Sequence, residues 1–331
     1  MFRAYGLYSH IQRNRLVSAL LLASFVVLLQ ALSFAFALLF EAWGRGGTAT
    51  AIVARAAADM RHAAPIGLGV AAVWFVIALF GHRQMIAAAT GARELTRAAA
   101  PDVHRILENL CISRGLPTPR LTIIEDPALN AFASGLSVDD ASIGLTRGLI
   151  DTLAPEEIEA VLAHELTHIR NRDVQTMVIA VIFAGLFSFV ADLTFRNWDF
   201  PMGRGPRRSS SKSKGGGVVI VVILALAIIA LSWGLSTLAR LALSRSREYL
   251  ADAGAVELTK NPDALISALR KIEGAAKMPA MPSRMAGFFI ENPAQPRRDE
   301  WLATHPSMQS RIDALVRFAG GRADPALPRS A

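Results

Sequence analysis

Residues 155–170 read PEEIEAVLAHELTHIR, and this stretch decides what kind of fold the rest of the chain must support. Proline is favoured at the first helical position, and the two acidic residues after it complement the positive end of a helix dipole. Apolar residues then recur at helical spacing, so we expect a helix that runs to about Arg172. Such a helix presents His164 and His168 one turn apart on a single face, with Glu165 between them.

The spacing of these three residues predicts a hydrolytic metal site. Neutral imidazole nitrogens suit Zn²⁺, and two of them four positions apart on a helix aim at a common point. The intervening glutamate lies near the open coordination position, where it can take a proton from a water that zinc has made acidic. We therefore expect one Zn²⁺ on His164 and His168, with Glu165 as the base. A solvated helix face with this pattern by chance is the competing interpretation, and it is a rare coincidence in a chain with seven histidines.

A catalytic zinc needs a third protein ligand, and the segment 244–252, SRSREYLAD, offers one. A helix there places Glu248 and Asp252 one turn apart on one face. We expect Glu248 to be the third ligand and Asp252 to accept the free N–H of a ligand histidine, which fixes its tautomer. A Glu and an Asp at this spacing are common on solvent-exposed helix surfaces, so this assignment depends on the zinc motif at 164–168.

The composition places part of the chain in lipid. Of its 331 residues 52% are hydrophobic, which is unusual for a soluble protein. Stretches without Asp, Glu, Lys or Arg, long enough or nearly so to cross a hydrocarbon core of about 30 Å, run over 16–40, 63–82, 174–191 and 215–239. We expect about four transmembrane helices. The first apolar stretch is longer than a signal-peptide core and lacks a small-residue cleavage site, so we expect a retained anchor.

These spans predict an order of parts along the chain. We expect an N-terminus at 1–15, a two-span anchor at 16–82, a first catalytic part at 83–173, a two-span hairpin at 174–240 with a basic loop at 196–217, and a second catalytic part at 241–331. The hairpin returns the two motifs to one membrane surface. Residues 83–173 mix helical and strand-like patterns. The fold class is therefore a mainly α membrane protein with a small β-sheet and an α+β zinc peptidase domain.

Charge and cysteine content exclude some classes of protein. A net charge of +8 is spread along the chain and flanks the apolar spans, which favours lipid contact over nucleic acid. The single cysteine excludes an intramolecular disulfide and fits a reducing compartment. The pattern does not assign an oligomeric state.

The motifs together resemble the HtpX-type membrane zinc metallopeptidases, which are kin to the CAAX prenyl endopeptidases. The resemblance spans most of the chain, and its landmarks are NAFASG at 130–135, HELTH at 164–168, REYLAD at 247–252 and THP at 304–306. It implies a gluzincin-like catalytic domain in a bacterial inner membrane, with the active site and the N-terminus on the cytoplasmic side. It also implies a role in quality control, with damaged, misfolded or misassembled membrane proteins as the polypeptide substrates.

The resemblance also assigns residues that the pattern alone does not. An edge strand that pairs with an extended substrate would contain Asn130, Ala131, Phe132 and Ala133. His305, with Arg311 after it, would stabilise the tetrahedral oxyanion. Without the resemblance, the strand is an ordinary strand and a histidine before a proline is a helix-entry residue.

Two other functions compete with a zinc endopeptidase. A non-catalytic scaffold or chaperone could keep the metal for structure, but a structural site has no use for Glu165 and closes its fourth position with another Cys or His. A small transporter is the weakest alternative, because the apolar spans carry no buried charges.

The basic loop at 196–217 would lie outside the cell if the active site faces the cytoplasm, whereas basic loops usually stay on the cytoplasmic side.

Overall fold

The computed structural model describes residues 7–179, 215–242, 246–273, 275–276, 278, 289–290 and 306–322. His305, residues 180–191 of the predicted third span and residues 196–214 of the predicted basic loop lie outside this set. The chain divides into two compact units, one made of residues 19–79 and 182–239 and the other of residues 1–18, 80–181 and 240–331. We call them the membrane unit and the catalytic unit.

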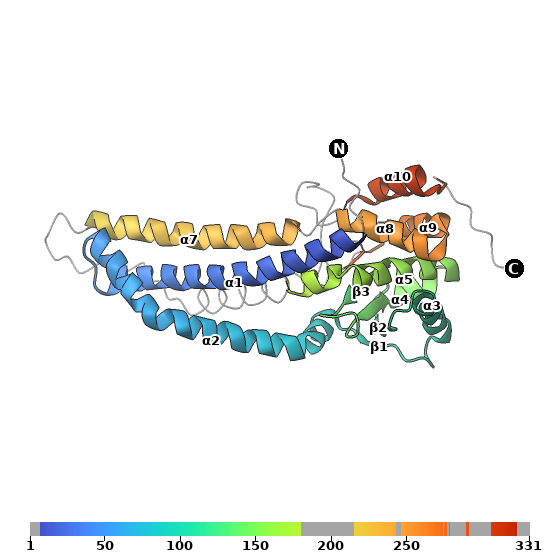
Figure 1. The fold of residues 1–331 in the computed structure, drawn as a ribbon, viewed down its shortest axis with the longest axis horizontal. Helices are drawn as coiled ribbons and strands as arrows, with labels where there is room; N and C mark the ends of the chain where they lie inside the picture. The colour runs from blue at the N-terminus through green and yellow to red at the C-terminus, as the bar shows by residue number, and fades with distance from the viewer. Residues whose placement is uncertain are drawn as a thin grey trace. The chain divides into compact units, whose positions relative to one another are not determined.

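The membrane unit consists of long apolar helices (Figure 1). They are parts of α1 (Leu7–Gly44), α2 (Ala49–Thr90) and α7 (Gly215–Ala242). Among the described residues, two segments are long and apolar enough to cross a membrane, Ala23–Gly44 and Ala49–Ile77, and a shorter apolar segment covers Gly216–Ser232. Many large apolar side chains on α2 and α7 are exposed, as is typical of helices that face lipid.

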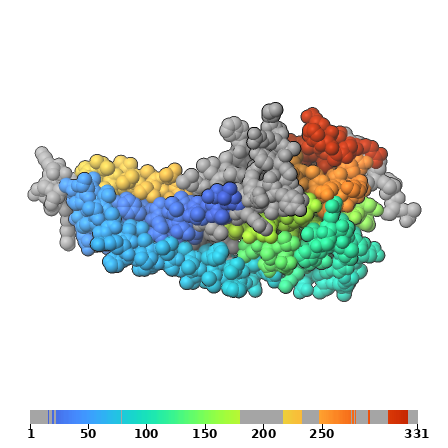
Figure 2. Space-filling view, viewed as in Figure 1, coloured from blue at the N-terminus to red at the C-terminus, as the bar shows by residue number. Residues whose placement is uncertain are grey.

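The three helices share a core where α1 turns into α2 and where α7 begins. Leu38 and Ile52 are fully buried there together with Val221 of α7. Helices α2 and α7 approach each other so closely here that residue 217 must be glycine, because a Cβ on Gly217 would lie 2.7 Å from the backbone nitrogen of Ala49. Yellow atoms of α7 accordingly meet blue atoms of the α1–α2 end in Figure 2. The start of α7 and the α1–α2 turn therefore lie at one end of this unit.

The second apolar span begins earlier than the sequence predicts. The stretch without charged residues begins at residue 63, whereas the segment of α2 that is long and apolar enough to cross a membrane covers Ala49–Ile77 and includes charged residues. One of those charges, Arg55, is compensated within the unit: it pairs with the buried carboxylate of Glu41 and donates to Gly46 O at 2.7 Å. Pro65 lies inside α2, which continues past it. The charge of Arg55 is thus paired inside the unit.

The catalytic unit contains a four-stranded mixed sheet in the order β1-β2-β4-β3. Its strands are β1 (Arg93–Glu94), β2 (Arg120–Ile124), β3 (Ala131–Ser134) and β4 (Ser142–Thr146). β2 and β4 are parallel, while β1 pairs with β2 and β3 pairs with β4 antiparallel. The ring of Phe132 covers its cross-strand partner Gly144, where a Cβ would lie 2.0 Å from Phe132 Cε1. The mixed sheet confirms the small β-sheet that the sequence predicts.

Helices pack around α5 (Pro155–Arg170), which lies between the sheet and α8 (Ser246–Thr259) and α9 (Pro262–Ile272) (Figure 1). Further helices of this unit are α3 (Pro101–Ile112), α4 (Arg147–Thr152) and α10 (Met308–Ala319). Glu157 fixes the start of α5, because its carboxylate accepts from Ala154 N at 2.7 Å and from Lys271 Nζ of α9 at 2.7 Å. The helix that the sequence predicts from Pro155 is therefore the buried centre of the unit.

Candidate active site

Helices α5 and α8 cross closely enough to bring their polar residues together. Gly254 of α8 makes this possible, because a Cβ there would lie 2.4 Å from Thr167 Cγ2 on α5. The crossing places Glu248, two turns before Gly254, beside the histidines of α5. His164 and Glu248 are 1% and 4% exposed, so the polar cluster lies in the interior of the unit.

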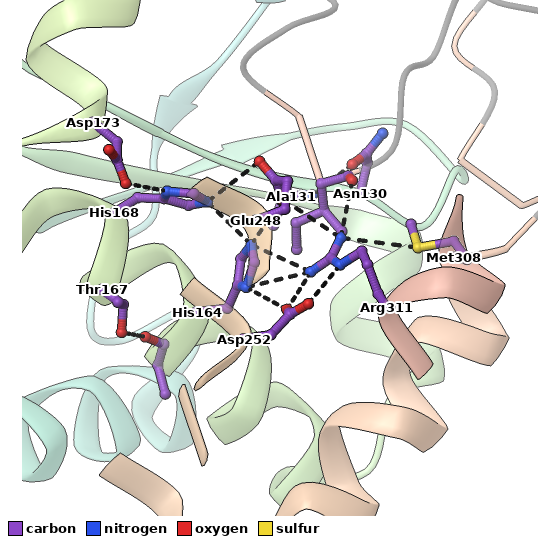
Figure 3. A network of polar contacts seen from close by, with 12 residues as sticks. Asn130, Ala131, His164, Thr167, His168, Asp173, Glu248, Asp252, Met308 and Arg311 are labelled. Atoms are coloured by element: carbon purple, nitrogen blue, oxygen red, sulfur yellow. Dashed lines mark hydrogen bonds and ion pairs between the residues drawn. The ribbon is translucent and has the colours of Figure 1, made fainter. Parts of the chain in front are cut away.

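Three side chains converge on one point (Figure 3). His164 Nε2 and His168 Nε2 are 3.2 Å apart, and Glu248 places one oxygen 3.6 Å from the first and the other 3.7 Å from the second. Zn–N bonds of about 2.0–2.1 Å in a tetrahedron separate two ligand nitrogens by roughly 3.3 Å. The observed spacing therefore matches ligands on adjacent corners of a zinc tetrahedron.

The hydrogen bonds behind the two rings strengthen this fit. His164 Nδ1 lies 3.0 Å from Asp252 Oδ1, and His168 Nδ1 lies 3.0 Å from Asp173 Oδ2. A carboxylate accepts the Nδ1 proton of a neutral imidazole and leaves a lone pair on Nε2. Two such lone pairs would face each other across 3.2 Å, which repels unless a cation lies between them. The donor set therefore fits Zn²⁺.

The electrostatics of His164 point the same way. Burial lowers the pKa of His164, but its hydrogen bonds to Asp252 and Glu248 outweigh burial and raise the pKa to about 9. Without metal, this ring holds a proton at neutral pH, so a positive charge is favoured at the centre of the cluster. Zinc takes the place of that proton when it binds.

Glu165 lies beside the cluster and is 2% exposed. Burial raises its pKa, against the lowering effect of His164 and His168. A carboxylate with a raised pKa is a stronger base than one in water, which suits a group that must take a proton from water near neutral pH. Its place in α5 between the ligand histidines is the place that the sequence analysis expects for the base.

Arg311 of α10 contacts the groups that hold the ligands. It is fully buried and donates to both oxygens of Asp252, from Nε at 2.9 Å and from Nη2 at 2.6 Å. Its Nη2 is also 3.4 Å from His164 Nδ1. Burial raises the pKa of Asp252, but Arg311 and His164 together outweigh burial, and the pKa lies below its usual value. These contacts give Arg311 a positioning role through Asp252, and its predicted role at the oxyanion stays a prediction.

The remaining predicted residues are the substrate strand and His305. Ala131, Phe132 and Ala133 lie in β3, at the edge of the sheet that packs against α5, and Asn130 directly precedes the strand. The side-chain oxygen of Asn130 accepts from Ala131 N at 3.1 Å. His305 lies outside the described residues, so its role also stays a prediction.

Asp173 is the residue that the sequence analysis misses. It follows Arg172, whose φ of 60° turns the chain after α5 so that the buried Asp173 carboxylate reaches back to His168. A backbone angle in this region is uncommon for a residue other than glycine. The signal in the sequence is an acidic residue just beyond the end of a ligand helix, and it is weak.

Replacing Asp173 with asparagine is expected to weaken zinc binding by about 10–100-fold, because a carboxylate that holds a ligand histidine contributes roughly this much to metal affinity. Zinc affinity measured by competition with a chelator of known strength checks this. The matched control is Asp139→Asn, on an exposed residue near the end of β3. Equal zinc affinity in the two variants would contradict a role for Asp173.

Comparisons with known proteins agree with this chemistry. A family model described as Peptidase family M48 matches residues 97–319. A protein of Bacteroides fragilis strain YCH46 named "Protease HtpX homolog" is 37% identical over 326 residues, which cover 95% of this chain and 99% of that protein. A protein of Lactobacillus acidophilus with the same name is 35% identical over 312 residues, which cover 93% and 99%.

A solved structure is also similar to the chain. "Crystal Structure of S. mikatae Ste24p" matches with 21% sequence identity and a TM-score of 0.43, over 76% of this chain and 57% of that one.

Proposed function

The chain belongs to peptidase family M48 and is a membrane-bound zinc metallopeptidase, and from this premise we propose that it hydrolyses damaged, misfolded or misassembled membrane proteins on the cytoplasmic side of a bacterial inner membrane. The observation that carries the peptidase chemistry is the buried His164–His168–Glu248 cluster with Glu165 beside it. A scaffold with a structural zinc is not favoured, because the cluster offers three ligands and a base.

The mechanism follows from the positions of these residues. His164, His168 and Glu248 would hold the zinc ion, which would supply Lewis acidity to a water and to the scissile carbonyl. Glu165 takes a proton from the attacking water as its oxygen bonds to the carbonyl carbon, and delivers that proton to the leaving amine nitrogen as the C–N bond breaks. Asp252 and Asp173 keep both imidazoles in the tautomer that binds metal. Substrate pairs with β3 through its backbone, which tolerates many side chains.

The arrangement of the membrane unit supports the proposed orientation. If α1 and α2 both cross the bilayer, the α1–α2 turn and the start of α7 share one membrane face, because they pack together. α7 has 28 residues, which span about 42 Å as a helix, enough to return to the other face. Its end at Ala242 precedes α8 by a few residues in the sequence, and we propose the second face as the side of the catalytic residues. Basic residues at 13, 15 and 83 flank the first two apolar spans at the ends away from the α1–α2 turn, which favours the cytoplasm for that face.

Cysteine labelling in membranes tests this orientation. The native Cys111 is buried, so a thiol placed at an exposed position reports its own side of the membrane. We expect Arg105→Cys, in the catalytic unit, to react with a membrane-impermeant thiol reagent only in inverted membrane vesicles. We expect Thr48→Cys, in the α1–α2 turn, to react with the same reagent only in intact cells whose outer membrane has been permeabilised. The opposite pattern would place the active site outside and overturn the cytoplasmic assignment.

A further inference from the structure

The outer edge of β3 already carries a partner from the same chain. β3 ends the sheet, and on its inner side it pairs with β4. On its outer side the backbone N–H of Ile290 donates to Ala131 O at 3.0 Å, and Phe289 forms an antiparallel bridge with Phe132. A strand edge presents unpaired N–H and C=O groups that accept another chain. Here that edge is held by Phe289 and Ile290.

Burial shows how completely this edge is covered. Ala131, Phe132 and Ala133 are 0%, 1% and 3% exposed, although they form the last strand of the sheet. Phe289 and Ile290 are 0% and 3% exposed, and the rings of Phe132 and Phe289 are 5.2 Å apart between centroids. An incoming polypeptide cannot pair with a strand edge in this condition.

The same two residues also reach the groups around the metal ligands. Arg311 Nη1 donates to Ile290 O at 3.4 Å, and Arg311 holds Asp252, which in turn contacts His164. The N–H of Ile290 therefore donates to the substrate strand β3, and its C=O accepts from Arg311, which holds Asp252. An extended substrate that pairs with β3 beside the zinc ligands would need this place for its own backbone.

We propose that Phe289 and Ile290 are an internal occupant of the substrate-pairing edge, and that an extended polypeptide with aromatic and branched aliphatic residues binds by displacing them. This inference rests on the proposed function, because it takes β3 as the substrate strand. It specifies the substrate class as an unfolded apolar segment, which can supply both the backbone pairing and the ring contact with Phe132.

An internal occupant raises the apparent dissociation constant for substrate. That constant equals the dissociation constant for the free edge divided by the fraction of molecules in which the edge is free. The described contacts of the occupant with β3 include a backbone hydrogen bond and an aromatic contact, and a substrate strand can replace both. Ile290→Pro removes the N–H that donates to Ala131 O and keeps residue 289 extended. We expect this variant to free the edge and to bind substrate about ten-fold more tightly.

The test measures binding and uses no hydrolysis. A fluorescent peptide with the sequence of residues 286–292, AGFFIEN, is titrated into the zinc-loaded, detergent-solubilised full chain carrying Glu165→Gln, with and without Ile290→Pro. Phe318→Ala is the matched control, since Phe318 is 82% exposed on α10. A peptide with Ser-Ser-Thr in place of Phe-Phe-Ile measures binding that does not depend on the apolar residues. Zinc content and thermal melting show that each variant is folded.

A dissociation constant about ten-fold lower with Ile290→Pro, for the apolar peptide alone, supports the inference. An unchanged or higher dissociation constant in a folded, zinc-loaded variant overturns it and makes Phe289 and Ile290 a permanent strand of the sheet. If Ile290→Pro does not fold, Phe289→Ala is measured with the same two outcomes. A chain that binds the peptide as expected but never cleaves any polypeptide would refute the proposed function and leave this inference standing.

Discussion

Glu165→Gln is expected to lower kcat for peptide hydrolysis by about 10²–10⁴-fold while the chain keeps its zinc. Glutamine has nearly the shape of glutamate but cannot take a proton from water, so the change removes general-base catalysis and little else. Glu165 is not one of the three residues whose ligand atoms converge, which is why zinc content should not change. The raised pKa of the native carboxylate is consistent with a base that works near neutral pH.

Cleavage of an unfolded reporter by detergent-purified chain, with zinc measured in the same samples, checks this prediction. Glu159→Gln is the matched control, because Glu159 lies on the same helix and outside the ligand cluster. We expect this control to cleave at the wild-type rate. A Glu165→Gln variant that cleaves as fast as its control would remove Glu165 from the mechanism, whatever its zinc content.

Glu248→Gln is expected to remove both zinc and activity. The carboxylate of Glu248 provides two oxygens, at 3.6 Å from His164 Nε2 and 3.7 Å from His168 Nε2. Because Glu248 is only 4% exposed, its negative charge compensates the positive charge of a metal ion that water cannot solvate there. A neutral amide offers only a weak carbonyl donor and leaves the ion with less compensation. Loss of one of three ligands should lower zinc occupancy from about one per chain to a small fraction after dialysis.

Elemental analysis after dialysis against a weak chelator measures this effect. Glu257→Gln is the matched control, since Glu257 lies on the same helix, is about half exposed and pairs with Arg114. We expect the control to keep both zinc and activity. Full zinc occupancy in Glu248→Gln would show that another residue supplies the third ligand.

Local patterns were enough to group the residues of α5, whereas the partners from other parts of the chain needed further arguments or were missed. His164, Glu165 and His168 lie within one helix, so helical periodicity alone places them together. Glu248 needed a topological argument, because α8 and α5 are far apart in the sequence and pack together only in the folded chain. Asp173 was missed because its contact depends on the unusual backbone angle of Arg172, which no spacing rule contains.

The sheet and the membrane helices also contain features that local sequence patterns do not predict. The two-residue strand β1 has exposed residues and no alternating pattern, so the sequence does not predict it. Phe289 pairs with Phe132 across a long separation in sequence, and its neighbours carry no pattern that names the partner. Among the residues that the structure describes, two segments are long and apolar enough to cross a membrane, and they overlap the first two predicted spans.

Removal and return of the metal tests the central claim most directly. The detergent-purified wild-type chain is stripped with a chelator, assayed on an unfolded polypeptide reporter, and assayed again after addition of about one equivalent of Zn²⁺. We expect cleavage to vanish with the metal and to return with it. Cleavage that survives complete removal of zinc, or no cleavage by the fully zinc-loaded chain, would contradict a zinc peptidase built on His164, His168 and Glu248.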